Sequence, residues 1–403
     1  MKILMVSLDN SKEVLLGGKH IHQKLIEKGF IELGHSVDTI YPSNKRIINA
    51  KRILIKILAQ FTAFFQILSF KDKMQTYVAY IVNSLGQKFK KNKYDFILAE
   101  DTVSAFAVKK YFMKNGDKIP VLLTLHGYFP RETVNYGYYN DINRKRVFDY
   151  CFSIENEAVR FADAIVTVDT RIKNYLHDEH DRSENVYVVF NAIDDKRFFP
   201  VSDEEKKKLR KELNLESDKT NLLVARRFVL KNGMQYGIEA ARILVSMGYD
   251  KFQLVIAGDG PEKNNLTELV SKYKLDLYVK FTGSVDHSMV DKYYKTSDIL
   301  LMPSTKSDDV EEATSLSMLE GMICGKVVIA SAIGGMKEVI RDGENGMLVD
   351  DKSPDQIAQK IINLMNDNNL YKKISSRAYE YTRENHAYKN HAWKFLDIYG
   401  KLK

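Results

Sequence analysis

The stretch Glu312-Ala-Thr-Ser-Leu-Ser-Met-Leu-Glu320-Gly-Met-Ile-Cys-Gly-Lys-Val-Val-Ile-Ala-Ser331 decides how this chain folds. Thr314 and Ser315 are residue types that cap helix N-termini well. The residues that follow predict one apolar helix face that ends at Gly325, formed by Leu316, Leu319, Met322 and Ile323. An apolar strand comes directly afterwards, so a helix and a buried strand alternate within a few residues.

The start of this helix predicts an anion-binding site. The free N–H groups around Ser315 and Leu316 would attract a phosphate. Glu312 lies in the loop before the helix and Glu320 about one turn inside it, so their carboxylates would accept hydrogen bonds from hydroxyls on either side of that phosphate. On spacing alone a second interpretation is equally good, in which one acid is a helix-dipole partner and the other is solvated surface.

The same alternation extends along the whole chain. Short apolar runs separated by helix-like segments predict parallel strands that are covered by helices on both faces. A first series of strands is predicted at Ile3–Ser7, Val37–Tyr41, Phe96–Ala99, Val121–Leu125, Ala164–Val168 and Val186–Val189. A second series is predicted at Leu222–Ala225, Leu254–Ala257, Val279–Thr282, Ile299–Met302, Val327–Ala330 and Met347–Val349. The fold class is therefore α/β, with two doubly wound, Rossmann-like domains.

A break between the two series places the domain boundary. Asn191–Pro200 and a charged stretch over residues 202–219 separate them, so we expect one domain over residues 1–195 and another over residues 196–382. In doubly wound sheets ligands bind outside the carboxyl ends of the strands. We therefore expect the site to lie in a cleft between the two domains.

Composition excludes several classes of protein. The chain has 403 residues, 44% hydrophobic and 28% charged, which is typical of a globular soluble protein with two domains. Its first residues lack the longer apolar region and the cleavage site of a signal peptide, which favours a cytoplasmic location. Cys151 and Cys324 are far apart in apolar surroundings, so we expect neither a disulfide framework nor a zinc site.

The positive charge is concentrated in residues 44–94. This segment contains eleven Lys or Arg and one acid, Asp72, so it carries +10 while the whole chain carries +8 and the remainder −2. Apolar residues between Ile53 and Leu68 fall on one helical face, interrupted by Lys56 and by glutamines that rule out a membrane span. The segment is either a helix packed on the first domain with a solvated basic edge, or an interfacial helix that contacts anionic lipid. Nucleic acid is a weaker third partner because no binding module accompanies the charge.

Further candidate residues follow predicted strands. Gly17 and Gly18 come after the first strand, where a backbone without side chains would approach a diphosphate. No Gly-x-Gly-x-x-Gly or Walker A pattern is present, which argues against a nicotinamide enzyme or a P-loop ATPase. His126 ends a strand and is a candidate for a sugar-hydroxyl or proton contact. Arg226 and Lys231 also follow a strand and would hold a leaving diphosphate.

Taken together, these residues resemble the retaining glycosyltransferases of family 4, which have the GT-B fold. The resemblance covers nearly the whole chain and is strongest over residues 220–350. In the second half the matching points are Arg226 with Lys231, Ile256–Pro261, Phe281–Val285, Asp298–Ser304, Glu312 with Glu320, and Gly334–Gly346. In the first half they are Gly17-Gly18, Thr124–His126, Ala162–Ala164 and Asn191–Asp194.

The resemblance implies a function and a role for each residue. A sugar would move from a nucleotide-sugar donor, a UDP- or GDP-sugar, to a glycan or lipid-linked acceptor in bacterial cell-surface polysaccharide or glycoconjugate synthesis. The implied catalytic residues are Glu312, His126, Arg226 and Lys231. The implied donor-binding residues are Gly17, Gly18, Arg226, Lys231, Val285, Thr314, Ser315, Leu316 and Glu320. In this reading Glu320 binds the ribose, Val285 faces the base, and Glu312 and His126 hold the transferred sugar from opposite sides.

The resemblance also implies no cofactor and no essential metal, because no Asp-x-Asp motif is apparent and the Arg226 and Lys231 pair supplies the positive charge. A C-terminal helix over about 383–403, which carries Trp393, would return to the first domain. The location would be the cytoplasm, at the inner face of the cell membrane if the basic segment binds lipid.

The chain departs from the pattern of the family at two positions, and two alternative functions remain open. Ala313 and Ala225 stand where many members of the family have glycine, which we interpret as tuning for the substrate. A nucleotide-sugar epimerase with the same fold needs no acceptor. A partner subunit that binds glycan without turnover would also keep the fold.

Overall fold

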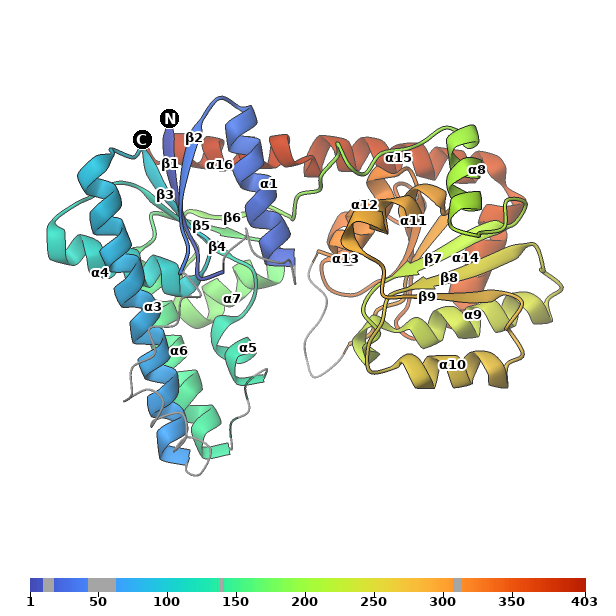
Figure 1. Ribbon diagram of the computed structural model, residues 1–403, viewed down its shortest axis with the longest axis horizontal. Helices are drawn as coiled ribbons and strands as arrows, with labels where there is room; N and C mark the ends of the chain where they lie inside the picture. The colour runs from blue at the N-terminus through green and yellow to red at the C-terminus, as the bar shows by residue number, and fades with distance from the viewer. Residues whose placement is uncertain (10–17, 43–62, 136, 138, 140, 307–313) are drawn as a thin grey trace. The chain divides into compact units, whose positions relative to one another are not determined.

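The computed structural model describes residues 1–9, 18–42, 63–135, 137, 139, 141–306 and 314–403 (Figure 1). These residues form two compact units, the first comprising Met1–Phe190 with Lys389–Lys403 and the second Asn191–Tyr388. Each unit contains a six-stranded sheet, and all the strand pairs in both sheets are parallel. The α/β fold class that the sequence predicts is confirmed. The sequence-based division lies nearby, at 195/196 and at about 382/383.

The sheet of the first unit has the strand order β2-β1-β3-β4-β5-β6. Its strands are β1 (Lys2–Val6), β2 (Ser36–Ile40), β3 (Phe96–Ala99), β4 (Val121–Leu125), β5 (Ala164–Thr167) and β6 (Val186–Val188). The central strands β3, β4 and β5 are buried along their whole length. Such strands read as continuous apolar runs because helices cover both faces of the sheet, which is why the sequence located them.

Helices pack on both faces of this first sheet. The helices of this unit are α1 (Gly18–Glu32), α3 (Ala63–Lys91), α4 (Thr102–Asn115), α5 (Phe129–Asn135), α6 (Asp141–Phe161), α7 (Thr170–His180) and α16 (Tyr388–Lys401), and α5 packs on α6. Successive residues of a strand point to opposite faces. Leu4 and Val6 accordingly pack in one core with residues of α3, α4, α6 and α7, whereas Ile3 and Met5 pack in another with residues of α1 and α16.

The C-terminal helix α16 belongs to the first unit. Phe395 is fully buried, and the ring of Tyr399 stacks on that of Phe96 with 4.6 Å between centroids. The expected return of this helix to the first domain is therefore observed. Trp393, however, is 57% exposed, so the residue that drew attention in the sequence faces away from the surface on which its helix packs.

The sheet of the second unit has the order β12-β11-β10-β7-β8-β9. Its strands are β7 (Thr220–Ala225), β8 (Phe252–Ala257), β9 (Val279–Gly283), β10 (Ile299–Met302), β11 (Val327–Ser331) and β12 (Met347–Val349). Its α-helices are α8 (Asp203–Glu212), α9 (Met234–Ser246), α10 (Lys263–Lys272), α11 (Val290–Thr296), α12 (Leu316–Ile323), α13 (Met336–Val339), α14 (Pro354–Asn366) and α15 (Asn368–His386). Two short 3-10 helices, η1 (Leu230–Asn232) and η2 (His287–Met289), follow β7 and β9.

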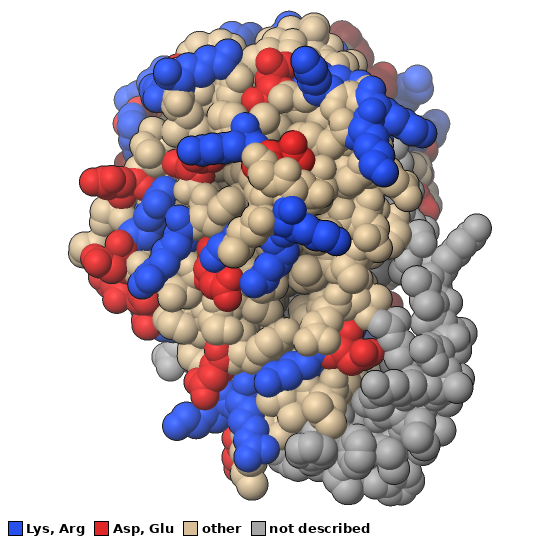
Figure 2. All heavy atoms as spheres, turned by 90° about the vertical axis from the view of Figure 1, so that its left-hand side faces the viewer, with Lys and Arg blue, Asp and Glu red and all other residues tan. Residues whose placement is uncertain are grey.

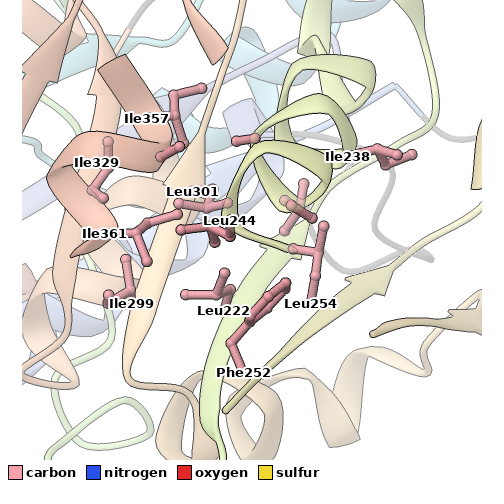
Figure 3. Close-up of a cluster of buried hydrophobic side chains, with 14 of the residues drawn as sticks. Leu222, Ile238, Leu244, Phe252, Leu254, Ile299, Leu301, Ile329, Ile357 and Ile361 are labelled. Carbon is pink, nitrogen blue, oxygen red and sulfur yellow. The ribbon is translucent and has the colours of Figure 1, made fainter. Parts of the chain in front are cut away.

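One face of the second sheet carries the largest apolar cluster among the described residues. Figure 3 shows Ile238 of α9 and Ile361 of α14 beside Leu222 and Leu301 of the central strands. The opposite face is covered by α11, α12 and α15. With both faces covered, the carboxyl edge of the sheet is left as the place where polar side chains gather.

Only part of the basic segment lies among the described residues. The apolar face expected between Ile53 and Leu68 lies mostly at 43–62, outside the described residues. The helix that is described, α3, begins at Ala63 and continues to Lys91. Figure 2 shows lysines and arginines spread over this side of the molecule with acids among them. No helix in the described parts of the chain is long and apolar enough to cross a bilayer.

Candidate active site

In the second unit a cationic site forms where β7 and β10 end. These strands are parallel neighbours in the sheet, so their carboxyl ends meet. Arg226 follows directly after β7, and its Nη1 donates a hydrogen bond to Oγ of Ser304, which lies two residues after β10 and is fully buried. The strand order thus brings together an arginine and a serine that are 78 residues apart.

Two glycines let the surrounding loops approach closely. Gly258 has φ +146°, and a Cβ built there would lie 2.1 Å from the carbonyl oxygen of Arg226. Gly233 has φ +65°, and its Cβ would lie 1.8 Å from the carbonyl oxygen of Pro303. No side chain fits at either place, and both backbone angles favour glycine. The loop that carries Arg226 is therefore fixed by contacts that only glycine permits.

Lys231 lies in η1, on the loop that Gly233 closes. The N–H of Thr305 donates to the Lys231 carbonyl oxygen at 2.9 Å, and the Asn232 side chain donates to the Arg227 carbonyl oxygen at 2.7 Å. Among the residues that the structure describes, no carboxylate forms an ion pair with the ammonium group of Lys231. Its backbone is thus held in place while its charge is not neutralised by a described partner.

The start of α12 lies beside this cationic site. Oγ of Ser317 donates to the Ala225 carbonyl oxygen at 3.3 Å, which joins the first turn of α12 to the end of β7. Asn191 donates to the Thr314 carbonyl oxygen at 2.9 Å. Ser315 occupies the N-cap position without a capping hydrogen bond from its side chain. The first N–H groups of an α-helix have no partner inside the helix, so Ser315 and Leu316 present donors next to Arg226.

Glu320 is buried one turn further along α12. Burial raises the pKa of its carboxyl group to about 7, although a hydrogen bond from Tyr294 of α11 and the charge of Arg197 act in the opposite direction. A carboxyl group with this pKa changes charge near neutral pH. Glu320 can therefore accept two hydrogen bonds from vicinal hydroxyls in its ionised form only.

Some predicted residues lie apart or outside the described chain. Val285 is half-buried and follows β9, at the same carboxyl edge of the sheet but two strands away from β7. Glu312 and Gly17 lie outside the described residues. The structure thus places Arg226, Ser315, Leu316 and Glu320 in one unit. The role of Glu312 stays a prediction from the sequence.

In the first unit the predicted residues are Gly18 and His126. Gly18 is exposed and begins α1. His126 follows β4, and its Nε2 lies 3.2 Å from Oε2 of Glu100, which follows the neighbouring strand β3. The His126 side chain is 17% exposed, whereas that of Glu100 is fully buried. Only His126 of this pair has an open side toward solvent.

Sequence reasoning missed the polar residues around His126. Lys19 pairs with Asp9 at 2.8 Å and with Asp101 at 3.1 Å. Burial alone would lower the pKa of Lys19, but the Asp101 and Asp9 carboxylates outweigh burial and raise it. Asp101 also caps α4 by accepting from the Ser104 N–H. The adjacent acids Glu100 and Asp101 at the end of an apolar run are the signal that would have found this group.

Comparison with known proteins identifies the family. A sequence model described as Glycosyl transferases group 1 matches residues 205–381, and another described as Glycosyltransferase Family 4 matches residues 16–197. One match falls on each unit, and between them they leave little of the chain unmatched. The chain belongs to the group 1, family 4 glycosyltransferases, and the resemblance read from its motifs is confirmed.

Individual relatives agree with this assignment. An uncharacterized glycosyltransferase of Methanocaldococcus jannaschii is 25% identical over 411 residues, covering 99% of this chain and 98% of that protein. The N-acetyl-alpha-D-glucosaminyl L-malate synthase of Bacillus anthracis is 27% identical over 68% of this chain, which spans 66% of that protein's length. Anabaena HepE in complex with UDP has a TM-score of 0.72 at 18% identity, with 100% of both chains covered. This structural likeness establishes the GT-B fold.

Proposed function

We propose that this glycosyltransferase moves a sugar, with retention of anomeric configuration, from a UDP- or GDP-sugar to a glycan or lipid-linked acceptor. The observation that carries the proposal is the cationic site at the carboxyl edge of the second sheet. There Arg226, the loop that carries Lys231 and the first turn of α12 lie beside one another. Two cations and a helix N-terminus form an environment that suits a diphosphate.

The chemistry requires neutralisation of a leaving group. When the bond between the sugar C1 and the diphosphate oxygen breaks, negative charge grows on the diphosphate, and Arg226 and Lys231 stabilise it in place. The acceptor oxygen forms its bond to C1 on the same face, and its proton passes to the departing phosphate oxygen. No protein nucleophile and no divalent ion are needed for these steps, so we propose a metal-independent enzyme.

The remaining residues orient the donor. The Glu320 carboxylate accepts hydrogen bonds from the ribose hydroxyls, and the backbone at Val285 faces the base. Gly17 and Gly18 contribute backbone groups to the diphosphate, while Glu312 and His126 hold hydroxyls of the transferred sugar. The names of two relatives support a nucleotide-sugar chemistry of this kind, since HepE was crystallised with UDP-glucose and the Bacillus anthracis relative is a glucosaminyl malate synthase.

A membrane contact belongs to the same proposal, because a lipid-linked acceptor lies at a surface. Two apolar side chains are exposed near basic residues, Leu68 on α3 at 37% and Ile142 on α6 at 65%. Lys73, Lys145 and Arg146 on these two helices are exposed as well. Basic and apolar side chains side by side suit anionic headgroups at the inner face of a bacterial membrane.

Nucleotide release tests the enzymatic part. Purified protein with EDTA is incubated with UDP-, GDP- and ADP-sugars, with and without glycan and lipid-linked acceptors, and the nucleoside diphosphate is measured. We expect release from one donor class, stimulated by an acceptor, abolished in Lys231→Ala and unchanged in Lys208→Ala, an exposed lysine of α8. Loss of activity with EDTA would contradict metal independence, and epimerisation of the donor without acceptor would contradict glycosyl transfer.

Vesicle sedimentation tests the membrane contact. We expect binding to vesicles that contain phosphatidylglycerol and none to pure phosphatidylcholine, with a steep decrease at high salt. The double variant Lys73→Glu, Arg146→Glu should bind more weakly. Binding that is equal for both vesicle types would remove this part of the proposal.

A further inference from the structure

A buried cluster of histidines surrounds Glu100 in the first unit. Oε2 of Glu100 lies 3.2 Å from Nε2 of His126 and 3.5 Å from Nε2 of His22 on α1. The ring of His22 meets that of His126 edge-on at 4.7 Å, and that of His391 on α16 at 5.0 Å. The side chains of His22 and Glu100 are fully buried. Four different elements therefore supply one polar cluster directly behind His126.

Burial disfavours the protonated imidazoles of His22 and His126. Burial lowers the pKa of His22 to about 4 although Glu100 acts to raise it. Burial, assisted by the charge of Lys19, lowers the pKa of His126 to about 3. A neutral imidazole has one N–H, which lies on either Nε2 or Nδ1. The partner of one ring nitrogen decides which of these tautomers is present.

Glu100 is that partner. A carboxylate can only accept hydrogen bonds, and one of its oxygens faces both Nε2 atoms at 3.2 and 3.5 Å. Only the approach of His126 has the geometry of a hydrogen bond, in which an ionised Glu100 accepts from an N–H at Nε2. The arrangement therefore places hydrogen on Nε2 of His126, and leaves its Nδ1 with a free lone pair.

The backbone that carries Glu100 is anchored by the next residue. Asp101 accepts hydrogen bonds from the Leu8 N–H at 2.8 Å and from the Ser104 N–H at 2.8 Å. It also pairs with Lys19 on α1. The ends of β1 and β3 and the starts of α1 and α4 are thus joined at this point. Glu100 has little freedom to move away from His126.

We propose that Glu100, supported by His22, is a positioning residue that fixes His126 in the Nε2–H tautomer and presents Nδ1 as a hydrogen-bond acceptor to a hydroxyl of the transferred sugar. Glu100 itself is buried and does not contact the sugar. The proposal rests on the proposed function in assigning a sugar contact to His126. The tautomer itself is a property of the protein alone.

A zinc site is the competing interpretation, because two imidazoles and a carboxylate are ligands that zinc accepts. The Lys19 ammonium disfavours it, since this cation acts on His22, His126 and Glu100 alike. The contact between Nε2 of His126 and the Glu100 carboxylate also has the geometry of a hydrogen bond from an N–H donor. Metal ligation would require a lone pair at this nitrogen.

Nitrogen-15 NMR of the histidine rings tests the tautomer without any substrate. In wild-type protein at pH 7, we expect His126, assigned by its loss in His126→Gln, to show a protonated Nε2 and an unprotonated Nδ1. In Glu100→Ala we expect a mixture of both tautomers. A protonated Nδ1 in the wild type would overturn the proposal. So would one equivalent of Zn²⁺ bound by the wild type and lost in Glu100→Ala.

Kinetics of two variants test the consequence. Glu100→Gln keeps the shape and a carbonyl acceptor for His126, so it should retain most of the wild-type kcat, whereas Glu100→Ala should lose about tenfold to a hundredfold, the range seen when partners that orient a ligating histidine are removed. Nucleotide affinity should be unchanged in both, because neither Glu100 nor His126 is assigned a contact with the nucleotide. Equal kcat in wild type and a folded Glu100→Ala would overturn positioning. If the wild type turns over no donor, the proposed function fails while the NMR result still decides the tautomer.

Discussion

The carboxyl edges of the two sheets have opposite electrostatic designs. In the first unit the polar groups are buried and paired with each other, as Glu100 is with His126 and Lys19 with Asp101. In the second unit the cations Arg226 and Lys231 are half-exposed, and the first N–H groups of the adjacent helix have no partner inside that helix. The first design suits the orientation of neutral hydroxyls, and the second suits the binding of a charge that grows during a reaction.

The largest expected effect comes from removing the arginine of the second unit. Arg226→Ala should lower kcat/KM about a thousandfold, the range seen when a preorganised partner of developing negative charge is lost. Arg226→Lys should recover part of this loss, because a lysine keeps the charge but not the forked geometry. Steady-state kinetics measure both. The neighbouring exposed Arg227 is the matched control, and an equal loss in Arg227→Ala would mean that charge density alone matters.

Removing Glu312 should lower the rate of sugar transfer more than the affinity for the nucleotide. Glu312→Ala is expected to lower kcat about a hundredfold, as for a group that acts on the reacting sugar, while the affinity for the free nucleoside diphosphate changes less than about twofold. Calorimetry and initial rates give the two values. Donor turnover that is unchanged in this variant would contradict a catalytic role for Glu312.

The second acid should give the donor affinity a pH dependence. The pKa of Glu320 is raised to about 7 by burial, so its carboxylate acceptor is present above this pH and lost below it. Nucleotide-sugar affinity should therefore rise about tenfold from pH 6 to pH 8. The diphosphate of a nucleotide sugar has no proton that titrates in this range. Calorimetry should find this pH dependence of affinity in the wild type and not in Glu320→Gln. A pH dependence that persists in Glu320→Gln would mean that another group causes it.

The buried histidines of the first unit should give stability a smaller pH dependence. Their pKa values lie at about 4 and about 3 in the folded protein and near 6.5 in the unfolded chain. The unfolded chain thus binds more protons, and stability present above pH 6.5 is lost as the pH falls toward 4. The groups that face His22 are Glu100, Lys19, His126 and His391. Burial raises the pKa of Glu100, which opposes the loss, so the net change is smaller than the two histidines alone would give.

Urea denaturation measures that change. The midpoint for wild-type protein should fall between pH 6.5 and 4.5, and the fall should be smaller in His22→Gln. Lys208→Ala, which changes an exposed residue of α8, serves as the control for general effects of charge. A midpoint that is constant over this range would show that these histidines are not held neutral in the fold.

The sequence predicted the strands and helices far better than it predicted which residues contact one another at the candidate site. Buried parallel strands such as β3, β4, β10 and β12 appear in the sequence as continuous apolar runs between turn residues, so their bounds could be predicted to the residue. The start of α12 was visible for a similar reason, because Ser315 is a capping residue type followed by an apolar periodicity.

Contacts between distant elements could not be read in this way. The pairing of Arg226 with Ser304 depends on the order of strands in the sheet, which local periodicity does not contain. The cluster around Glu100 depends on α16, which comes from the other end of the chain and supplies His391. The exposure of Trp393 could not be predicted, because a single aromatic residue on a helix does not reveal which face packs. Such pairings require the topology.

One binding measurement tests the central claim, that the second unit holds the donor diphosphate through its cations. UDP-, GDP- and ADP-sugars are titrated by calorimetry into wild-type protein in the presence of EDTA. The same titrations are then made with the double variant that combines Arg226→Ala and Lys231→Ala. We predict that at least one donor binds the wild type with a micromolar Kd and that the double variant loses this binding. Equal affinity in the double variant, or wild-type binding that requires a divalent ion, would contradict the account.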